Sequence, residues 1–472
     1  MNALFKRIGI WIGIGLFLLI MSCTNDMSKT IMEVDNKEVV TTQQIPANVD
    51  DVVLVDSEQA INVAEAFWGN FTDNTVNIRT GKLEKNVSKT SDISIETVMD
   101  NDTPLMYIIN YPDGGFAIIS ANRNYYPVLA YSDKNNFILD PEIETLWFWI
   151  ESEKEAIREC NSLVESTKEE IRALWRFYEP KLRTDLTDEI STRAYSTEIA
   201  AYNARKAALE SALSSSGWTI YALPAAQYAM ESSVWSNLYS MAGNNAYSQN
   251  YSIVGIKNVS GINPNVGPLL STAWHQVAPT WSPTGTSCNA GCVTVAIAQI
   301  MNYYNWSYSN VNDLYLSIGK KLGLNYSSCD VGATFSQAKS AFQSFGYNAS
   351  SASHSATTVR DQLLANKPVF MGGYTSGGNG HAWVCDGTQW LNFSTNYFVE
   401  FLSLEWWLYG GYDYTWFSGS SSSPNTCSNS TNVYFYMNWG FSGSGNGWFL
   451  DSNPNAPTGL YNKNRENVYA NP

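Results

Sequence analysis

Apolar residues in the middle of the chain recur with the period of a helix that buries one face. Val293, Ala296, Ile297 and Ile300 fall at positions i, i+3, i+4 and i+7, and this spacing forms one apolar stripe on an α-helix. Cys292 directly precedes the stripe. The pattern therefore predicts a buried helix that begins at Cys292.

The N-terminal half combines helical and strand patterns. Apolar positions from Ser57 onward predict an amphipathic helix, and residues 141–176 return to a helical period with many charges. Three apolar runs between them predict strands, at residues 105–111, 116–120 and 128–132. The turn residues 112–115 join the first two runs as a hairpin. We therefore expect a small α+β domain over residues 53–180.

Residues 181–265 form an insertion or linker with helical and aromatic character. Their Ala-rich part, residues 197–216, predicts a helix, and turn residues at 261–265 predict a loop that would mark a boundary. The next stretch, residues 266–472, has helical patterns first and strand patterns later. Helices are predicted near residues 334–345 and 355–366. Three strands are predicted: one at residues 368–373, one directly after the glycine-rich loop that starts at residue 377, and one at residues 433–438. Strands after helices favour a second α+β domain with an antiparallel sheet.

The N-terminus has the pattern of an export signal. Lys6 and Arg7 precede an apolar run that is shorter than a membrane span. The run ends at Ile20-Met21-Ser22-Cys23, which resembles the bacterial lipoprotein cleavage box. We expect residues 1–23 to be a lipoprotein-type signal that ends at a lipidated Cys23, and residues 24–52 to be a flexible tether. The alternative is an ordinary signal peptide. Both predict export, the first as an outer-membrane or cell-surface lipoprotein that contacts the membrane only through its anchor.

Charge and cysteine content narrow the possible partners. The formal net charge is −15, and most acidic residues lie before residue 266. The sequence has no basic patch of the kind that would indicate a nucleic-acid partner. A disulfide among Cys288, Cys329 and Cys427 is compatible with export, although the sequence does not select a pair. Cys288 and Cys292 lack a second close Cys or His pair, so we expect no zinc or other metal site.

Cys292 is the first candidate for chemistry. A thiol at a helix N-terminus feels a partial positive charge that favours the thiolate, and the first-turn N–H groups can bind an anion. A sulfur nucleophile beside oxyanion donors is what acyl transfer requires. The alternative is a buried structural cysteine.

A cysteine nucleophile needs a base, and histidine is the usual one. The chain has three histidines. His381 enters a predicted strand after a glycine-rich loop, which favours it as the base. His354 lies in a polar loop and is predicted to be a solvated surface residue, and His275 is predicted to be structural.

Six short sequence motifs, taken in their order along the chain, match the motif pattern of a known protein family. They are Gly114 to Ser120, Trp274 to Pro279, Gly291-Cys292-Val293 with its helix, Pro368-Val369-Phe370, Gly380 to Gly387, and Asn438-Trp439-Gly440. In this order they resemble the streptopain family of papain-like cysteine peptidases. The resemblance covers roughly residues 53–180 and 266–455. It implies a papain-like catalytic domain, with a helical part and an antiparallel sheet, preceded by a propeptide domain and without a cofactor.

The resemblance assigns a role to each candidate residue. Cys292 would be the nucleophile, and His381 the base that later protonates the leaving amine. Asn438 would orient the imidazole by accepting a ring N–H, with Trp439 shielding that bond from water. Gln276 would donate to the tetrahedral oxyanion together with the Cys292 backbone N–H.

The chain departs from the family pattern in three places. An aromatic insert at about residues 388–431 separates the histidine strand from the Asn-Trp strand, where the family has a short hairpin; it would be a packed subdomain, a lid, a specificity wall or a propeptide dock. The family's Trp-Gly-Trp-Gly-Gly becomes Trp439-Gly440-Phe441-Ser442-Gly443. Residues 181–265 are a further addition.

The sequence thus predicts a secreted or surface-anchored cysteine endopeptidase made as a zymogen, acting on proteins and peptides. Residues 53–180 would be its own intramolecular inhibitor, and maturation would cut between about residues 181 and 268. Two alternatives use the same residues: a catalytically inactive surface protein that binds peptides or an inhibitor in the groove, and a papain-like acyltransferase.

Overall fold

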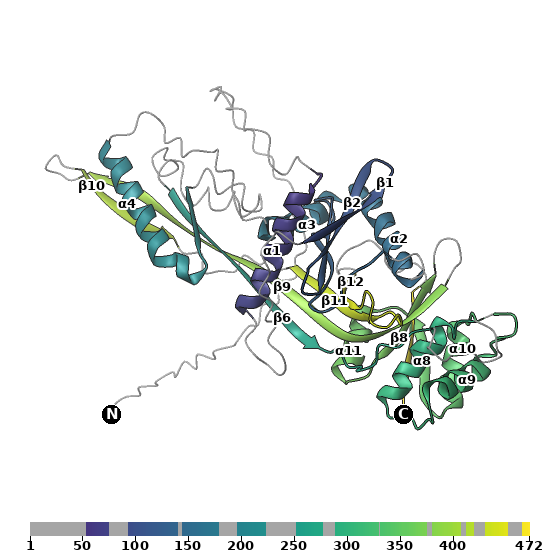
Figure 1. Ribbon diagram of the computed structural model, residues 1–472. Coiled ribbons are helices and arrows are strands. Elements are labelled where there is room, and N and C mark those ends of the chain that lie inside the picture. The colour runs from purple at the N-terminus through teal and green to yellow at the C-terminus, as the bar shows by residue number, and fades with distance from the viewer. Residues whose placement is uncertain are drawn as a thin grey trace, which may run out of the picture. The chain divides into compact units, whose positions relative to one another are not determined.

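The computed structural model describes eleven stretches of the chain (Figure 1). They are residues 53–74, 93–139, 144–178, 196–222, 252–276, 288–329, 331–374, 380–406, 412–419, 430–451 and 465–472. Cys23, Cys427 and the tether at 24–52 lie outside them. In the described stretches, no helix combines the length and apolar character needed to cross a membrane.

The N-terminal half folds as its periodicity predicts. Helix α1 (Ser57–Asn74) is followed by strands β1 (Ser94–Asp100), β2 (Thr103–Asn110), β3 (Phe116–Ser120) and β4 (Val128–Ser132). Helices α2 (Glu144–Glu159) and α3 (Glu165–Tyr178) complete it, joined by a 3₁₀ turn. The predicted hairpin is β2–β3. Among the described residues of this half, the sequence does not predict strand β1, because five of its seven residues are exposed and its pattern is mostly polar.

The C-terminal half also contains the predicted helices. They are α8 (Cys292–Tyr303), α10 (Phe335–Ser344) and α11 (Ala356–Leu364), and the sequence missed α9 (Val311–Leu322). Strands β8 (Val369–Tyr374) and β11 (Ser430–Asn438) match predicted strands. The sequence missed β7 (Asn348–Ser353), β12 (Gly447–Asp451) and β13 (Glu466–Asn471). The combination of helices with an antiparallel sheet in each half is the predicted α+β class.

A single antiparallel sheet runs through both halves. Its strand order is β1-β2-β3-β4-β12-β11-β9-β8-β13-β7, where β9 spans Gly380–Trp406. The halves meet where β4 pairs with β12, with Tyr131 opposite Trp448 and Ala130 opposite Phe449. The Tyr434 hydroxyl also donates to the Val128 carbonyl at 2.8 Å. The N-terminal half is therefore attached by main-chain pairing as well as by side-chain packing.

Three further strands of this sheet lie off that order, and strand β9 joins them, and with them the two additions, into one unit. It pairs with β6 (Ser252–Val266) and β10 (Tyr412–Gly419), and β6 pairs with β5 (Thr219–Ala222). Helix α4 (Ser196–Leu213) is tied to β9 by an ion pair of 2.7 Å between Arg205 and Glu400. A side chain at Gly255 would overlap the ring of Phe398, so the close β6–β9 approach requires glycine.

This unit corrects two predictions. The loop expected at 261–265 is part of β6, with a register irregularity between Ile262 and Asn265. The insert at about residues 388–431 does not begin as a separate subdomain. Its first residues continue β9, the strand of His381, and they pair with β6, most of which belongs to the addition at residues 181–265. The sequence missed both points because strand pairing across more than a hundred residues leaves no local pattern.

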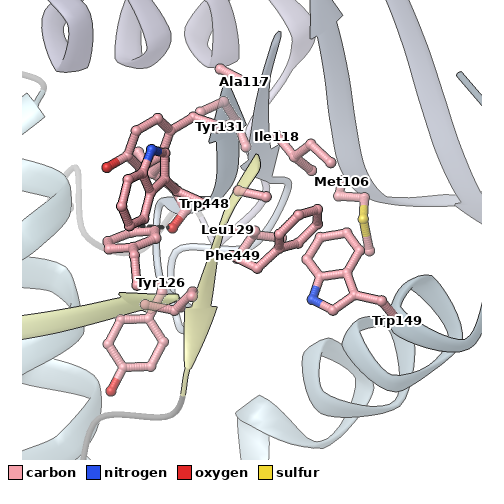
Figure 2. Close-up of a cluster of buried hydrophobic side chains, with 14 of the residues drawn as sticks. Met106, Ala117, Ile118, Tyr126, Leu129, Tyr131, Trp149, Trp448 and Phe449 are labelled. Atoms are coloured by element: carbon pink, nitrogen blue, oxygen red, sulfur yellow. Dashed lines mark hydrogen bonds between the residues drawn. The ribbon is translucent and has the colours of Figure 1, made fainter. Parts of the chain in front are cut away.

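The larger hydrophobic core includes side chains from both halves, and Phe449 lies at their junction (Figure 2). Its ring is 4.9 Å from the ring of Trp149 on α2 and 5.0 Å from that of Trp439, both in edge-to-face geometry. Such aromatic pairs add to the stability gained from burial alone. A second core cluster lies between α8, α9, α10 and the β8–β9 part of the sheet.

We expect Phe449→Ala to lower the free energy of unfolding by about 3–5 kcal/mol, because it opens a cavity between the two halves. Urea denaturation measures the loss. Ile138→Ala, at a side chain that is 58% exposed, is the control and should change stability by less than about 0.5 kcal/mol. A loss below about 1 kcal/mol for Phe449→Ala would contradict the shared core.

Candidate active site

Cys292 is the first residue of α8, as predicted. Its side chain is half-buried, and the helix from Val293 to Met301 is buried. Gly291 has φ 88°, and a Cβ there would lie 2.7 Å from the Val331 carbonyl oxygen. Only glycine fits both the conformation and the contact. The thiol is therefore presented at a helix N-terminus by a turn that allows no other residue.

A disulfide joins Cys288 to Cys329. It is one of the pairs that the sequence left open. The bridge and the contact between Gly291 and Val331 fix the residues that lead into α8 against Cys329 and Val331. Among the cysteines that the structure describes, Cys160, Cys292 and Cys385 are not disulfide-bonded.

Gln276 lies beside the start of α8. The Ala290 N–H donates to the Gln276 carbonyl at 2.9 Å, two residues before Cys292. On its other side, His275 forms a β-bridge with Phe441, and its carbonyl accepts from the Tyr315 hydroxyl at 3.1 Å. The segment predicted to supply the oxyanion donor and the predicted nucleophile are thus neighbours, although they are sixteen positions apart.

His381 is the second residue of β9 and pairs with Gly373 of β8. The next residue, Ala382, belongs to the buried cluster that includes Val293 and Ile297 of α8. Helix α8 packs against β8 and β9, so the strand that carries His381 contacts the helix that begins with Cys292. Its side chain is half-buried.

Asn438 ends β11 and is 3% exposed. Its side-chain N–H donates to the Thr272 carbonyl at 2.7 Å, and its oxygen accepts from the Gln299 amide at 3.3 Å. The oxygen that the resemblance assigns to His381 therefore accepts from Gln299 here. The assigned bond to the imidazole stays a prediction.

Trp439 is buried beside Asn438, where a shielding residue was predicted. Its indole N–H donates to the Gly445 carbonyl at 3.1 Å, and its ring lies 5.1 Å from that of Trp383, two residues after His381. The indole is thus packed between the histidine strand and the loop that follows Asn438.

The prediction that His354 is a solvated surface residue is wrong. Its side chain is 2% exposed, and its Nε2 lies 2.9 Å from Asp451 Oδ2. Arg465 contacts the other Asp451 oxygen. Burial alone would raise the pKa of Asp451, but His354 and Arg465 lower it to about 2. The sequence missed this cluster because β13, which follows Arg465, returns to pair with β7 just before His354.

Asp386 is a buried acidic residue near the candidate site to which the sequence gave no role. It is 1% exposed, and its carboxylate accepts from the Leu270 N–H at 2.9 Å while its backbone carbonyl accepts from Leu269 at 2.8 Å. Burial raises the pKa of Asp386 to about 7, against the lowering effect of these backbone donors. A Cβ at Gly267 would lie 2.3 Å from the Asp386 carbonyl oxygen. The segment that leads to Gln276 is therefore clamped to β9 at a point where only glycine fits.

Gln299 was also given no role by the sequence. It is fully buried on α8 and contacts both Asn438 and the Trp274 N–H. The one available signal was a lone amide within the apolar run from Ala296 to Met301. Within the described residues, no three His, Cys, Asp or Glu side chains gather as metal ligands.

Two family models match the chain. Residues 52–157 match the Spi protease inhibitor, and residues 307–449 match the Peptidase C10 family. The second match contains His381, Asn438 and Trp439 but begins after Gln276 and Cys292. Together the matches support a protease with an inhibitor-type propeptide.

Similarity to individual proteins adds little. No curated protein matches the sequence. A solved fragment of Prevotella intermedia prointerpain A, a cysteine-to-alanine mutant, is similar at 15% identity and a TM-score of 0.41, over 81% of this chain and 100% of that one. A likeness at this TM-score does not bear on function.

We expect Asp386→Asn to remove a pH dependence of stability. The folded-state pKa of about 7 lies above the ordinary value of about 4, so the folded wild type binds this proton more tightly than the unfolded chain does. The contribution of Asp386 to wild-type stability should therefore fall as pH rises from about 4 to 7, by at most about 4 kcal/mol. The asparagine still accepts from Leu270 but does not titrate.

Urea denaturation at several pH values measures this difference. The stability of Asp386→Asn relative to wild type should rise between about pH 4 and 7 and level off above it. Asp361→Asn, at a carboxylate that is 56% exposed, is the matched control and should follow wild type. A constant difference between Asp386→Asn and wild type would contradict the prediction.

Proposed function

This chain belongs, over residues 307–449, to the Peptidase C10 (streptopain) family, and from that membership we propose that it is the zymogen of a cysteine endopeptidase. The family match carries the proposal. The contact between the Gln276 carbonyl and the Ala290 N–H supports it, since it holds the backbone of Gln276 against a residue two positions before Cys292.

The proposed reaction proceeds through a covalent acyl-enzyme. The Cys292 thiolate attacks the carbonyl carbon of the scissile peptide bond, and the Gln276 side chain and the Cys292 N–H donate to the oxyanion. His381, which holds the thiol proton, transfers it to the leaving amine as the C–N bond breaks. Water then attacks the thioester, giving its proton to His381, and the free acid and the thiol are released.

Asn438 and Trp439 hold the histidine in this proposal. Asn438 is itself fixed by Thr272 and Gln299, so its side chain has a defined direction. An amide suits the role because it selects one imidazole tautomer without adding a charge. Trp439 keeps water away from that bond.

The N-terminal half acts as the intramolecular inhibitor. Its attachment through β4 and β12 places Asn135 against the loop after Trp439, where its amide donates to the Asn446 carbonyl at 2.9 Å. Leu146 packs at Gly445 of the same loop. Inhibition would therefore include contacts to a loop that borders the site.

Maturation would cut the chain before Ser252. Strand β6 pairs with β9 from Ser252 to Val266, so it would remain with the catalytic half after the cut. This narrows the expected region of 181–268 to residues upstream of β6. If Cys23 is the lipidated residue, the cut would release the catalytic half from the cell surface.

Self-processing tests the proposal. The chain from residue 24 is incubated near neutral pH with mild reductant, chosen to leave the Cys288–Cys329 bridge intact, and its mass is followed. Wild type should be cut between residues 181 and 252 and then cleave casein. Cys292→Ala should stay full length and lose activity by at least about 1,000-fold, because the nucleophile is gone.

Cys160→Ala is the matched control, since it removes a buried thiol in the other half. It should be processed like wild type. If wild type is neither cut nor active, and iodoacetamide labels Cys292 no faster than the other thiols, the proposal is wrong. An inactive binding protein would then explain the site better.

A further inference from the structure

Gln299 is a buried residue whose side-chain oxygen and nitrogen are both hydrogen-bonded. It is 0% exposed and lies on α8, seven residues after Cys292, which is about two helical turns along the same face. Its oxygen accepts from the Trp274 N–H at 3.1 Å, and its N–H donates to Asn438 Oδ1 at 3.3 Å. A buried amide is costly unless it is hydrogen-bonded, and this one is satisfied by two other segments of the chain.

These bonds connect the three segments that carry the candidate site. Trp274 lies two residues before Gln276, α8 begins with Cys292, and Asn438 ends β11. Asn438 returns to the first segment through Thr272. The result is a closed set of hydrogen bonds with Gln299 at its centre.

We propose that Gln299 is a positioning residue that sets the oxyanion donor and the orienting asparagine relative to the nucleophile helix. This inference rests on the peptidase proposed above. Gln299 does not touch the reacting atoms in this role. It acts through Trp274 on the placement of Gln276, and through Asn438 on the placement of the imidazole.

An amide suits this position because it donates at one end and accepts at the other. An apolar residue of similar length would fill the space but leave the Trp274 N–H and one Asn438 bond without this partner. Because small displacements of catalytic groups can cost about 100-fold in rate, loss of the two bonds should lower kcat more than it changes KM.

Two substitutions, each measured in the enzyme after self-processing, test the proposal. Gln299→Met should lower kcat by about 10-fold to 100-fold at every pH, with KM within about twofold of wild type. Gln299→Glu keeps the acceptor, and its carboxyl can donate to Asn438 only when protonated. Burial at this position should raise the pKa of the introduced carboxyl, so that it is protonated at about pH 5. The kcat of Gln299→Glu relative to wild type should therefore be near normal at about pH 5 and fall as the pH rises.

The matched control is Asn302→Asp, which makes the same amide-to-acid change on the same helix. Asn302 accepts from the Tyr308 hydroxyl at 2.6 Å, and a carboxylate can do the same, so kcat and its pH profile should follow wild type. The proposal is overturned if both Gln299 variants keep kcat within twofold of wild type, or if Gln299→Glu loses activity equally at every pH.

The alkylation rate of Cys292 distinguishes failure of the Gln299 inference from failure of the proposed peptidase function. If wild type hydrolyses no peptide, the peptidase proposal fails by itself. The rate at which iodoacetamide labels Cys292 is then measured against pH in wild type and Gln299→Met. A shifted profile supports a role of Gln299 in arranging the groups around the thiol, and identical profiles overturn it.

Discussion

The main-chain pairing of β9 is the constraint on which the rest of the structure depends. This one strand pairs with β8, β11, β6 and β10, and unpaired backbone groups in the interior would be costly. It carries His381 near its start and holds Asn438 opposite Val384. Its Asp386 fixes the segment that leads to Gln276. Displacing β9 would therefore disturb most of the candidate site together.

The inhibitor-type half is joined to this framework by strand addition, in which main-chain bonds give attachment and side chains give specificity. Phe449 of the β4–β12 pair contacts Trp149 of the N-terminal half and Trp439 of the site. Trp439 in turn contacts Trp383. The two halves thus share a core that reaches the residues beside His381 and Asn438.

Local patterns in the sequence were enough for most of the elements and for the family. The stripe after Cys292 predicted α8, the hairpin of β2 and β3 followed from its turn residues, and the two family models confirm the resemblance. Contacts between distant segments were not predictable. His354 is buried by a strand that returns about a hundred residues later, and Gln299 is informative only once Trp274 and Asn438 are known to meet it. The catalytic roles themselves remain predictions.

Covalent labelling with a peptide that carries an electrophilic vinyl sulfone tests the central claim most directly. Wild type that has processed itself, and His381→Ala that added tagged wild type has cut in trans and that is then separated from it, are treated with the reagent, and mass spectrometry locates the modified residue. The account predicts one label per chain, on Cys292, with labelling slowed strongly by His381→Ala. Equal labelling of Cys385, or labelling of Cys292 that does not depend on His381, would contradict it.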